Sequence, residues 1–172
     1  MGVDVMKFLT DSMFGKLTRF LRMFSYDTVY ANDLIDLYEI DPIPDDILRE
    51  YAEKTNRIVI TRDYPFHNKI PDKSIYLEGE GVYNFLKQLK EKLGLEYNIN
   101  MQHARCSVCN SELKKIENKN EIKEELNEST YLYYDTFYQC VNPECQKIFW
   151  NGPHIEDIKR RLKSKLISDA DI

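Results

Sequence analysis

Short apolar runs alternate with helically periodic segments through the first part of the chain. Four runs have the length and the β-branched, apolar composition of buried strands, and they lie at residues 6–10, 29–31, 57–61 and 74–77. Three other segments repeat apolar side chains every three or four residues, as one face of a helix does, at residues 13–24, 45–52 and 82–93. This alternation predicts an α/β fold, a parallel sheet flanked by helices.

The pattern changes after residue 95. Residues 96–104 are typical of a linker, and the aromatic residues at 131–139 and 147–150 favour two further strands. Residues 117–129 are charged and rich in Asn, which indicates a mobile or helical excursion, and residues 154–166 form a basic amphipathic helix. We therefore expect an α/β domain at residues 1–95, a linker at 96–104 and a second, small domain at 105–172.

The cysteines of the chain lie in two closely spaced pairs. Cys106 and Cys109 form a C-x2-C knuckle, and Cys140 and Cys145 form a wider C-x4-C knuckle. Two such turns can enclose one Zn²⁺ tetrahedrally, and because all four positions are then filled, the metal would be structural. The alternative is four unrelated or disulfide-bonded cysteines, which is less common in chains of the reducing cytosol.

Acidic residues follow the predicted strands or begin a predicted helix. Asp11 and Asp63 end two strands, Asp33 follows another, and Asp45 and Asp46 begin a helix. Ligands of parallel α/β sheets collect outside the carboxyl ends of the strands, and clustered carboxylates suit Mg²⁺ or Mn²⁺. Such a site can activate water for attack on a phosphodiester. The alternative is ordinary exposure or helix capping, which fits Asp45 and Asp46 well.

The charge balance is acidic, with 24 Lys and Arg against 29 Asp and Glu. A nucleic acid would therefore have to be bound by local patches. Lys16, Arg19 and Arg22 recur every three residues beside Asp11 and are candidates for phosphate contacts, although a solvated helix face explains each of them equally well. The chain has no apolar run of ~18 residues and no signal-peptide pattern at residues 1–10, so we expect no membrane span and a cytoplasmic location.

Four stretches carry a more specific pattern: residues 7–22 (KFLTDSMFGKLTRFLR), 45–52 (DDILREYA), 57–63 (RIVITRD) and 149–154 (FWNGPH). Together they resemble the Mut-seven C-terminal RNase family, from about residue 6 to residue 162. The resemblance implies a PIN-like nuclease domain joined to a zinc ribbon, with acidic residues at Asp11, Asp45 and Asp63. Asp33 and Asp46 match less directly because segment 34–44 looks longer than the family's pattern, which leaves the choice between Asp45 and Asp46 open.

The hypothesis is a divalent-metal-dependent endoribonuclease in which the aspartates hold Mg²⁺ or Mn²⁺. RNA is the expected partner, with ribosomal or ribosome-associated RNA as one candidate, and the residues expected to position its backbone are Lys16, Arg19, Arg22 and Arg62. Tyr138, Phe149 and Trp150 are candidates for stacking on bases, with packing inside the ribbon as the alternative.

Two other functions remain open. A non-catalytic RNA- or ribosome-binding module would keep the fold and use the ribbon and the basic helix at 154–166. A toxin of a toxin–antitoxin pair would need a partner that the sequence does not reveal. Carboxylates gathered in space would favour the enzyme, and scattered carboxylates would favour the binding module.

Overall fold

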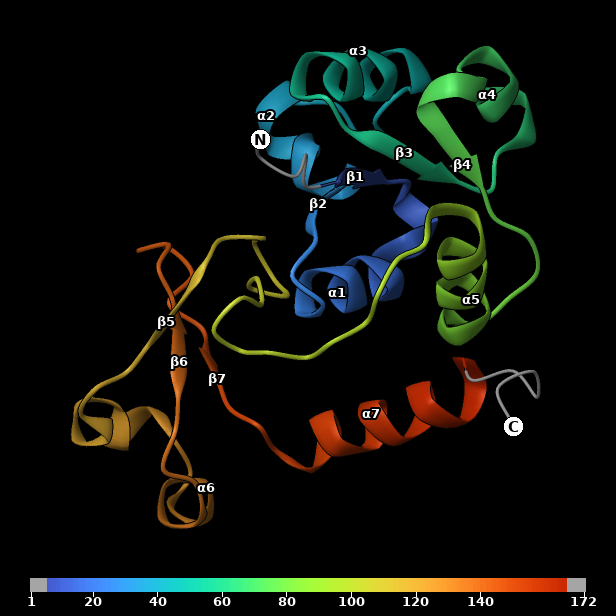
Figure 1. Ribbon diagram of the computed structural model, residues 1–172. Coiled ribbons are helices and arrows are strands. Elements are labelled where there is room, and N and C mark those ends of the chain that lie inside the picture. The colour runs from blue at the N-terminus through green and yellow to red at the C-terminus, as the bar shows by residue number, and fades with distance from the viewer. Residues whose placement is uncertain (1–5, 167–172) are drawn as a thin grey trace, which may run out of the picture.

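The computed structural model describes residues 6–166. Its larger part is a parallel sheet of four strands in the order β2-β1-β3-β4. The strands are β1 (Lys7–Thr10), β2 (Asp27–Tyr30), β3 (Ile58–Thr61) and β4 (Ser74–Tyr76). Helices cover both faces of this sheet, so the predicted α/β class is confirmed (Figure 1).

The helices divide between the two faces of the sheet. Helices α1 (Gly15–Met23) and α5 (Val82–Leu93) lie on one face, and α3 (Asp45–Thr55) and α4 (Tyr64–Lys69) lie on the other (Figure 1). Alternate strand side chains follow this division, because Phe8 and Ile60 pack in the cluster of α1 and α5, whereas Leu9 and Val59 pack in the cluster of α3 and α4. The short turns are η1 (Ser12–Phe14), η2 (Ala31–Leu34), α2 (Ile35–Tyr38) and η3 (Pro71–Lys73).

The two central strands, β1 and β3, adjoin helices on opposite faces of the sheet. Helix α1 follows β1 on one face, and α3 precedes β3 on the other. In open α/β sheets, ligands bind outside the carboxyl ends of the strands at such a reversal. Asp11 follows β1, Asp63 follows β3 and Asp45 begins α3, so the topology brings these three residues to the same edge.

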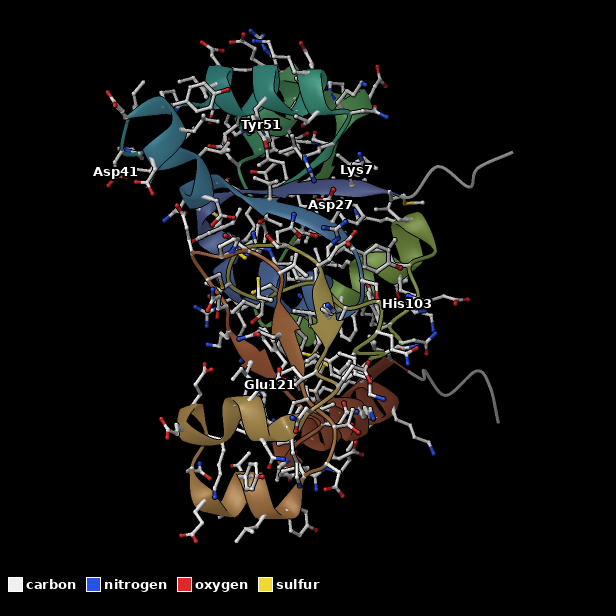
Figure 2. All side chains as sticks on the ribbon, turned by 90° about the vertical axis from the view of Figure 1, so that its left-hand side faces the viewer. Lys7, Asp27, Asp41, Tyr51, His103 and Glu121 are labelled. Carbon is white, nitrogen blue, oxygen red and sulfur yellow. The ribbon has the colours of Figure 1, made fainter. Side chains whose placement is uncertain are left out.

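The second part is an antiparallel sheet of three strands, β5 (Leu113–Lys115), β6 (Tyr138–Cys140) and β7 (Ile148–Phe149). A helical excursion, η4 (Lys119–Glu125) and α6 (Glu128–Tyr133), joins β5 to β6, and Figure 2 shows Glu121 far from the parallel sheet. The predicted strand at 131–139 is confirmed only at its end, because residues 131–133 are helical, residues 134–137 have no regular structure and β6 begins at Tyr138. The Asn127 side chain caps α6 by accepting a hydrogen bond from the Thr130 amide (2.7 Å), and this cap favours a helix over the local β propensity.

Helix α7 (Pro153–Leu166) follows the ribbon but packs against α5 (Figure 1). Its Ile158 and Leu162 are buried in the same cluster as Leu86 and Leu89 of α5. The division at residues 95 and 105 stays a prediction, and the core of the α/β domain includes a helix from beyond the ribbon. Within residues 6–166, no helix combines the length and apolar character that a membrane span requires.

Candidate active site and four-cysteine metal centre

Asp11 is held at the end of β1 through both of its carboxylate oxygens. Oδ2 accepts a hydrogen bond from the Thr61 hydroxyl (2.9 Å), and Oδ1 accepts one from the Ser12 amide (2.6 Å). The turn that follows is held by Tyr30, whose hydroxyl donates to the Ser12 carbonyl (2.5 Å). Gly15 leaves room for this contact, because a Cβ there would lie 3.3 Å from the Tyr30 hydroxyl. The Ser12 hydroxyl also donates to Oδ1 (3.3 Å), so the Asp11 carboxylate is oriented and Oδ2 is the oxygen that keeps a further lone pair.

Asp63 lies beyond β3 and caps α4. Its Oδ1 accepts a hydrogen bond from the Phe66 amide (2.8 Å), and its own amide donates to the Thr61 hydroxyl oxygen (2.9 Å). Thr61 is fully buried. Its hydroxyl therefore links the backbone at Asp63 to the carboxylate of Asp11 and fixes the spacing of the two residues.

Asp45 begins α3, and the charges of the other two aspartates affect the pKa of its carboxyl. Burial raises the pKa of the Asp45 carboxyl, the charge of Asp63 raises it further, and the charge of Asp11 acts in the same direction. Lys69 opposes this shift, with its Nζ 3.7 Å from Asp45 Oδ2. The three carboxylates thus form one electrostatic group at the edge of the sheet.

The three aspartates are not among the closely grouped metal-binding side chains of the described residues. In the described part of the chain, the group of metal-binding side chains whose ligand atoms all lie within 4.8 Å of one another is the four cysteines. The oxygens of Asp11, Asp45 and Asp63 are spread more widely. By the criterion set from the sequence, this wider spacing does not by itself favour the enzyme over the binding module. Carboxylate oxygens are nevertheless the donors that Mg²⁺ or Mn²⁺ prefers, and an ion among them would be held partly through water.

The structure places Asp33 and Asp46 apart from this group. Asp33 Oδ2 accepts hydrogen bonds from Arg22 (2.5 Å) and from the Tyr30 amide (3.1 Å). The Asp46 side chain is 82% exposed and lies 3.7 Å from Arg49 on the next turn of α3. Of the neighbours Asp45 and Asp46, we therefore retain Asp45 in the candidate site.

The four candidate RNA-binding cations lie in different environments. Lys16 and Arg19 are exposed on α1, and Arg62 is exposed at the end of β3, with its guanidinium 6.0 Å from the centre of the Phe85 ring. Arg22 is only 2% exposed, so its predicted place on a phosphate-binding surface is wrong. Successive residues of an α-helix rotate by about 100°, so a spacing of three drifts around the helix and turns Arg22 inward.

Arg22 instead ties the first cysteine knuckle to the α/β domain. Its Nη1 donates to the carbonyls of Ser107 (3.2 Å) and Val108 (2.8 Å), the two residues between Cys106 and Cys109. Its Nε donates to the Thr28 carbonyl of β2 (2.8 Å). The buried guanidinium therefore has a structural role between the two parts of the protein.

A second link between the ribbon and the α/β domain lies beside Arg22, at the side of the sheet that faces the ribbon (Figure 2). Asn110 accepts a hydrogen bond from the Thr28 amide (3.1 Å) and donates one to Asp27 Oδ1 (2.7 Å). Asp27 also pairs with Arg57 Nη1 (2.8 Å). Burial alone would raise the pKa of Asp27, but the hydrogen bonds from Arg57 and Asn110 and nearby positive charge outweigh burial and lower it.

Sequence reasoning missed two residues of the candidate site. The sequence contains a signal for Thr61, because this hydroxyl residue ends a strand and lies two residues before Asp63. Its hydroxyl can therefore contact the backbone of Asp63 and a side chain at the end of the neighbouring strand. Lys69 gives no local signal, because its partner Asp45 lies on a different helix.

An aromatic cluster that the sequence did not reveal borders Asp63. Tyr64 is 56% exposed and meets the ring of Tyr76 edge-on, with ring centres 5.4 Å apart. His67 stacks on Tyr76 at 5.9 Å, and its Nδ1 is hydrogen-bonded to the Ser74 hydroxyl (2.7 Å). Grouped rings beside an acidic site offer a surface on which a nucleobase can stack.

The four cysteine sulfurs have the spacing of a tetrahedral metal site. Cys106 Sγ lies 3.7 Å from Cys145 Sγ, and Cys109 Sγ lies 3.4 Å from Cys140 Sγ. Four sulfurs at 2.3 Å from a Zn²⁺ would lie about 3.8 Å from one another. Disulfide sulfurs would lie about 2.05 Å apart, so the cysteines are free thiols that can hold a metal such as zinc.

The electrostatic environments of these thiols differ. Burial raises the pKa of Cys106, and burial together with its thiol neighbours raises that of Cys140. Burial acts in the same sense on Cys109, but hydrogen bonds with Ser111 and with neighbouring thiols outweigh it and lower its pKa to about 6. The centre therefore contains one thiol that ionises readily.

The structure thus joins an α/β domain with an acidic edge to a four-cysteine ribbon that could hold a metal such as zinc. The chain matches the model of the Mut7-C RNAse domain over residues 6–162, nearly its whole length, and it belongs to this family. The family resemblance inferred from the sequence is thereby confirmed, and the family's name points to an RNA-related, nuclease-like function. The comparison with curated proteins and the comparison with solved structures give no match.

Proposed function

We propose that the protein is a divalent-metal-dependent endoribonuclease that hydrolyses RNA at the carboxyl edge of its parallel sheet. The observation that carries the proposal is the placement of Asp11, Asp45 and Asp63 at one edge of the sheet, where the charges of Asp63 and Asp11 add to the effect of burial and raise the pKa of Asp45. A hard divalent cation relieves this repulsion. The family match supports RNA as the substrate, with ribosome-associated RNA in the cytoplasm as one source.

The chain's own residues would orient the substrate and the metal. Asp11 is fixed by Thr61 and Ser12, and Asp63 is fixed by its role as helix cap. Lys16 and Arg19 follow Asp11 on α1 and would hold RNA phosphates beside it, as would Arg62. A bound Mg²⁺ or Mn²⁺ supplies an activated water and offsets the charge that develops on the phosphate.

We also propose that the four cysteines hold one Zn²⁺ with a structural role. The sulfur spacing supports this proposal, as does the small size of the ribbon, since small domains seldom bury enough apolar surface to fold alone.

The direct test is cleavage of labelled RNA with and without Mn²⁺ by the wild type, Asp11→Asn and Asp72→Asn. Asp72 is the matched control, because it is exposed in η3 at the opposite, amino edge of the sheet. We expect metal-dependent cleavage that Asp11→Asn slows on the order of 100-fold or more and that Asp72→Asn leaves unchanged. Equal rates for all three proteins would disprove the proposed site, and RNA binding without cleavage would favour the non-catalytic module.

The ends of the products report the chemistry. Attack by water leaves a 5′-phosphate and a 3′-hydroxyl, whereas attack by the neighbouring 2′-hydroxyl leaves a 2′,3′-cyclic phosphate and usually needs a histidine base. His67 is hydrogen-bonded to Ser74 and stacked on Tyr76, so it has a structural role in the aromatic cluster. Phosphatase and kinase treatment of the products should reveal 5′-phosphates, and a cyclic phosphate formed in EDTA would exclude the proposed mechanism.

A further inference from the structure

A large cleft lies between the two parts of the protein. It has a volume of about 920 Å³ and is walled by α1, α5, the ribbon strand β7 and α7. This volume is near the upper end of the range for small-molecule sites, so the cleft has room for a segment of a polymer.

The charge of the cleft is opposite to that of the chain. Its lining includes five cationic residues, Lys16, Arg19, Arg105, Lys147 and Arg161, and one carboxylate, Asp157, within a chain of net charge −5. Asp157 is paired with Arg161 of the lining and with Arg160 outside it, so the charges of Asp157 and Arg161 offset each other. Lys16, Arg19 and Lys147 are exposed. The cleft therefore favours a polyanion.

The walls between these cations are apolar and aromatic. Tyr83 is half-buried and meets the Phe20 ring edge-on, with ring centres 5.8 Å apart. Phe149 and Trp150 of the ribbon are also half-buried in the lining. A duplex hides its base faces, whereas a single strand exposes them to such rings. The lining thus matches a single strand better than a duplex.

Helix α1 connects the cleft to the acidic edge. The turn after Asp11 leads into α1, and Gly15, Lys16, Arg19 and Phe20 then line the cleft along successive turns. A nucleic acid bound at the acidic edge can therefore continue along α1 toward the ribbon.

We propose that this cleft binds the single-stranded RNA segment next to the cleaved bond, with its phosphates on Arg19 and Lys147 and its bases against the aromatic wall. The identity of the ligand rests on the proposed function. The ribbon then forms half of the substrate site, in addition to its structural role.

The test is the affinity of zinc-loaded protein for a short fluorescein-labelled single-stranded RNA, measured by anisotropy without Mg²⁺ or Mn²⁺. Arg19→Gln/Lys147→Gln removes two exposed cleft cations. Lys159→Gln/Lys163→Gln is the control, because it removes the same charge from exposed positions of α7 that do not line the cleft. We expect the cleft variant to bind roughly tenfold more weakly and to lose about 0.7 of the salt-dependence slope per contact, while the control binds like the wild type.

Three outcomes would overturn the proposal. They are a wild type that does not bind this RNA, a cleft variant that binds as tightly as the control, and a duplex of the same sequence that binds as tightly as the single strand. Cleavage with Mn²⁺ is scored separately. Cleft-dependent binding without cleavage would support the RNA-binding cleft and contradict the proposed nuclease activity. Cleavage without cleft-dependent binding would support the nuclease activity and contradict the RNA-binding cleft.

Discussion

At the scale of single residues, Asp63 combines a charge with a helix cap, and an Asn substitution separates the two. Asn caps helices about as well as Asp, so Asp63→Asn keeps the bond to the Phe66 amide and removes a charge that raises the Asp45 pKa. Without divalent metal, we expect the variant to be more stable than the wild type at neutral pH, by up to about 1 kcal/mol. The Asp45 pKa should also fall. Denaturation and carboxyl titration by NMR measure the two effects.

The sign of the pH dependence follows from the direction of the Asp45 shift. A raised pKa means that folded Asp45 takes up its proton before the unfolded residue does. The burial of its charge and the repulsion from Asp63 therefore cost stability at neutral pH, and this cost is relieved as the pH falls through the folded pKa. The advantage of Asp63→Asn should shrink over the same range. Asp11→Asn is the contrasting variant, because it loses an acceptor for Ser12 or Thr61 and should cost about 1 kcal/mol. Unchanged Asp45 titration in Asp63→Asn would contradict this account.

The ion pair of Asp27 and Arg57 changes stability with pH in the opposite direction to Asp45. The folded pKa of Asp27 is lowered, so its stabilisation is complete above the ordinary value of 3.8 and is lost as the pH falls through the lower folded value. Both side chains are largely buried, so Asp27→Asn should cost about 3 kcal/mol near neutral pH. Urea denaturation of both proteins across the acid range tests this. A difference that stays constant down to the lowest pH would argue against the pair.

At the scale of elements, helix α1 shows what periodicity can and cannot predict. Its apolar spacing places Leu17, Phe20 and Leu21 in the core, as their pattern predicts. The spacing of its cations could not reveal that Arg22 is covered, because the covering carbonyls of Ser107 and Val108 lie in the ribbon, more than eighty residues later in the chain.

Strand ends were the more informative part of the sequence. Asp11 and Asp63 lie at the edge where the alternating pattern places them, and the choice of Asp45 over Asp46 needed three-dimensional information. The three-residue strand β6 and the helix α6 were harder to predict, because a capping Asn and aromatic residues with strand preference compete within one short segment.

Arg22 and Arg19 form a matched pair on α1. Arg22→Ala would leave the Asp33 carboxylate and the carbonyls of Thr28, Ser107 and Val108 without their donor, and we expect a loss of about 3 kcal/mol or more. Arg19→Ala removes an exposed side chain and should change stability by less than about 0.5 kcal/mol. Chemical denaturation compares the two variants, and equal stabilities would mean that the Arg22 contacts contribute little.

At the scale of the whole molecule, the four-cysteine centre is joined to the α/β domain by the hydrogen bonds of Arg22 and Asn110. Elemental analysis should find one zinc per chain, because a tetrahedral site uses four thiolates. Cys106→Ser should lose the zinc and, through Arg22 and Asn110, weaken amide protection in β1 and β2. Val108→Ser is the control, since it changes a half-exposed side chain of the same knuckle and keeps the carbonyl that Arg22 binds. An ordered ribbon in metal-free protein would refute the zinc assignment.

Helix α7 follows the ribbon in the chain and packs against α5 of the α/β domain. Ribosomes build chains from the amino end, so the ribbon emerges before the helix that completes the α/β core. A nascent chain that has produced the whole parallel sheet still lacks Ile158 and Leu162, and the apolar surface that they cover stays open to solvent. A chain stopped before Cys106 should therefore bind more of a hydrophobic dye than the full chain does. The residues of the acidic edge are translated early, but the core beneath them is complete only after α7 has been synthesised, which happens after the ribbon.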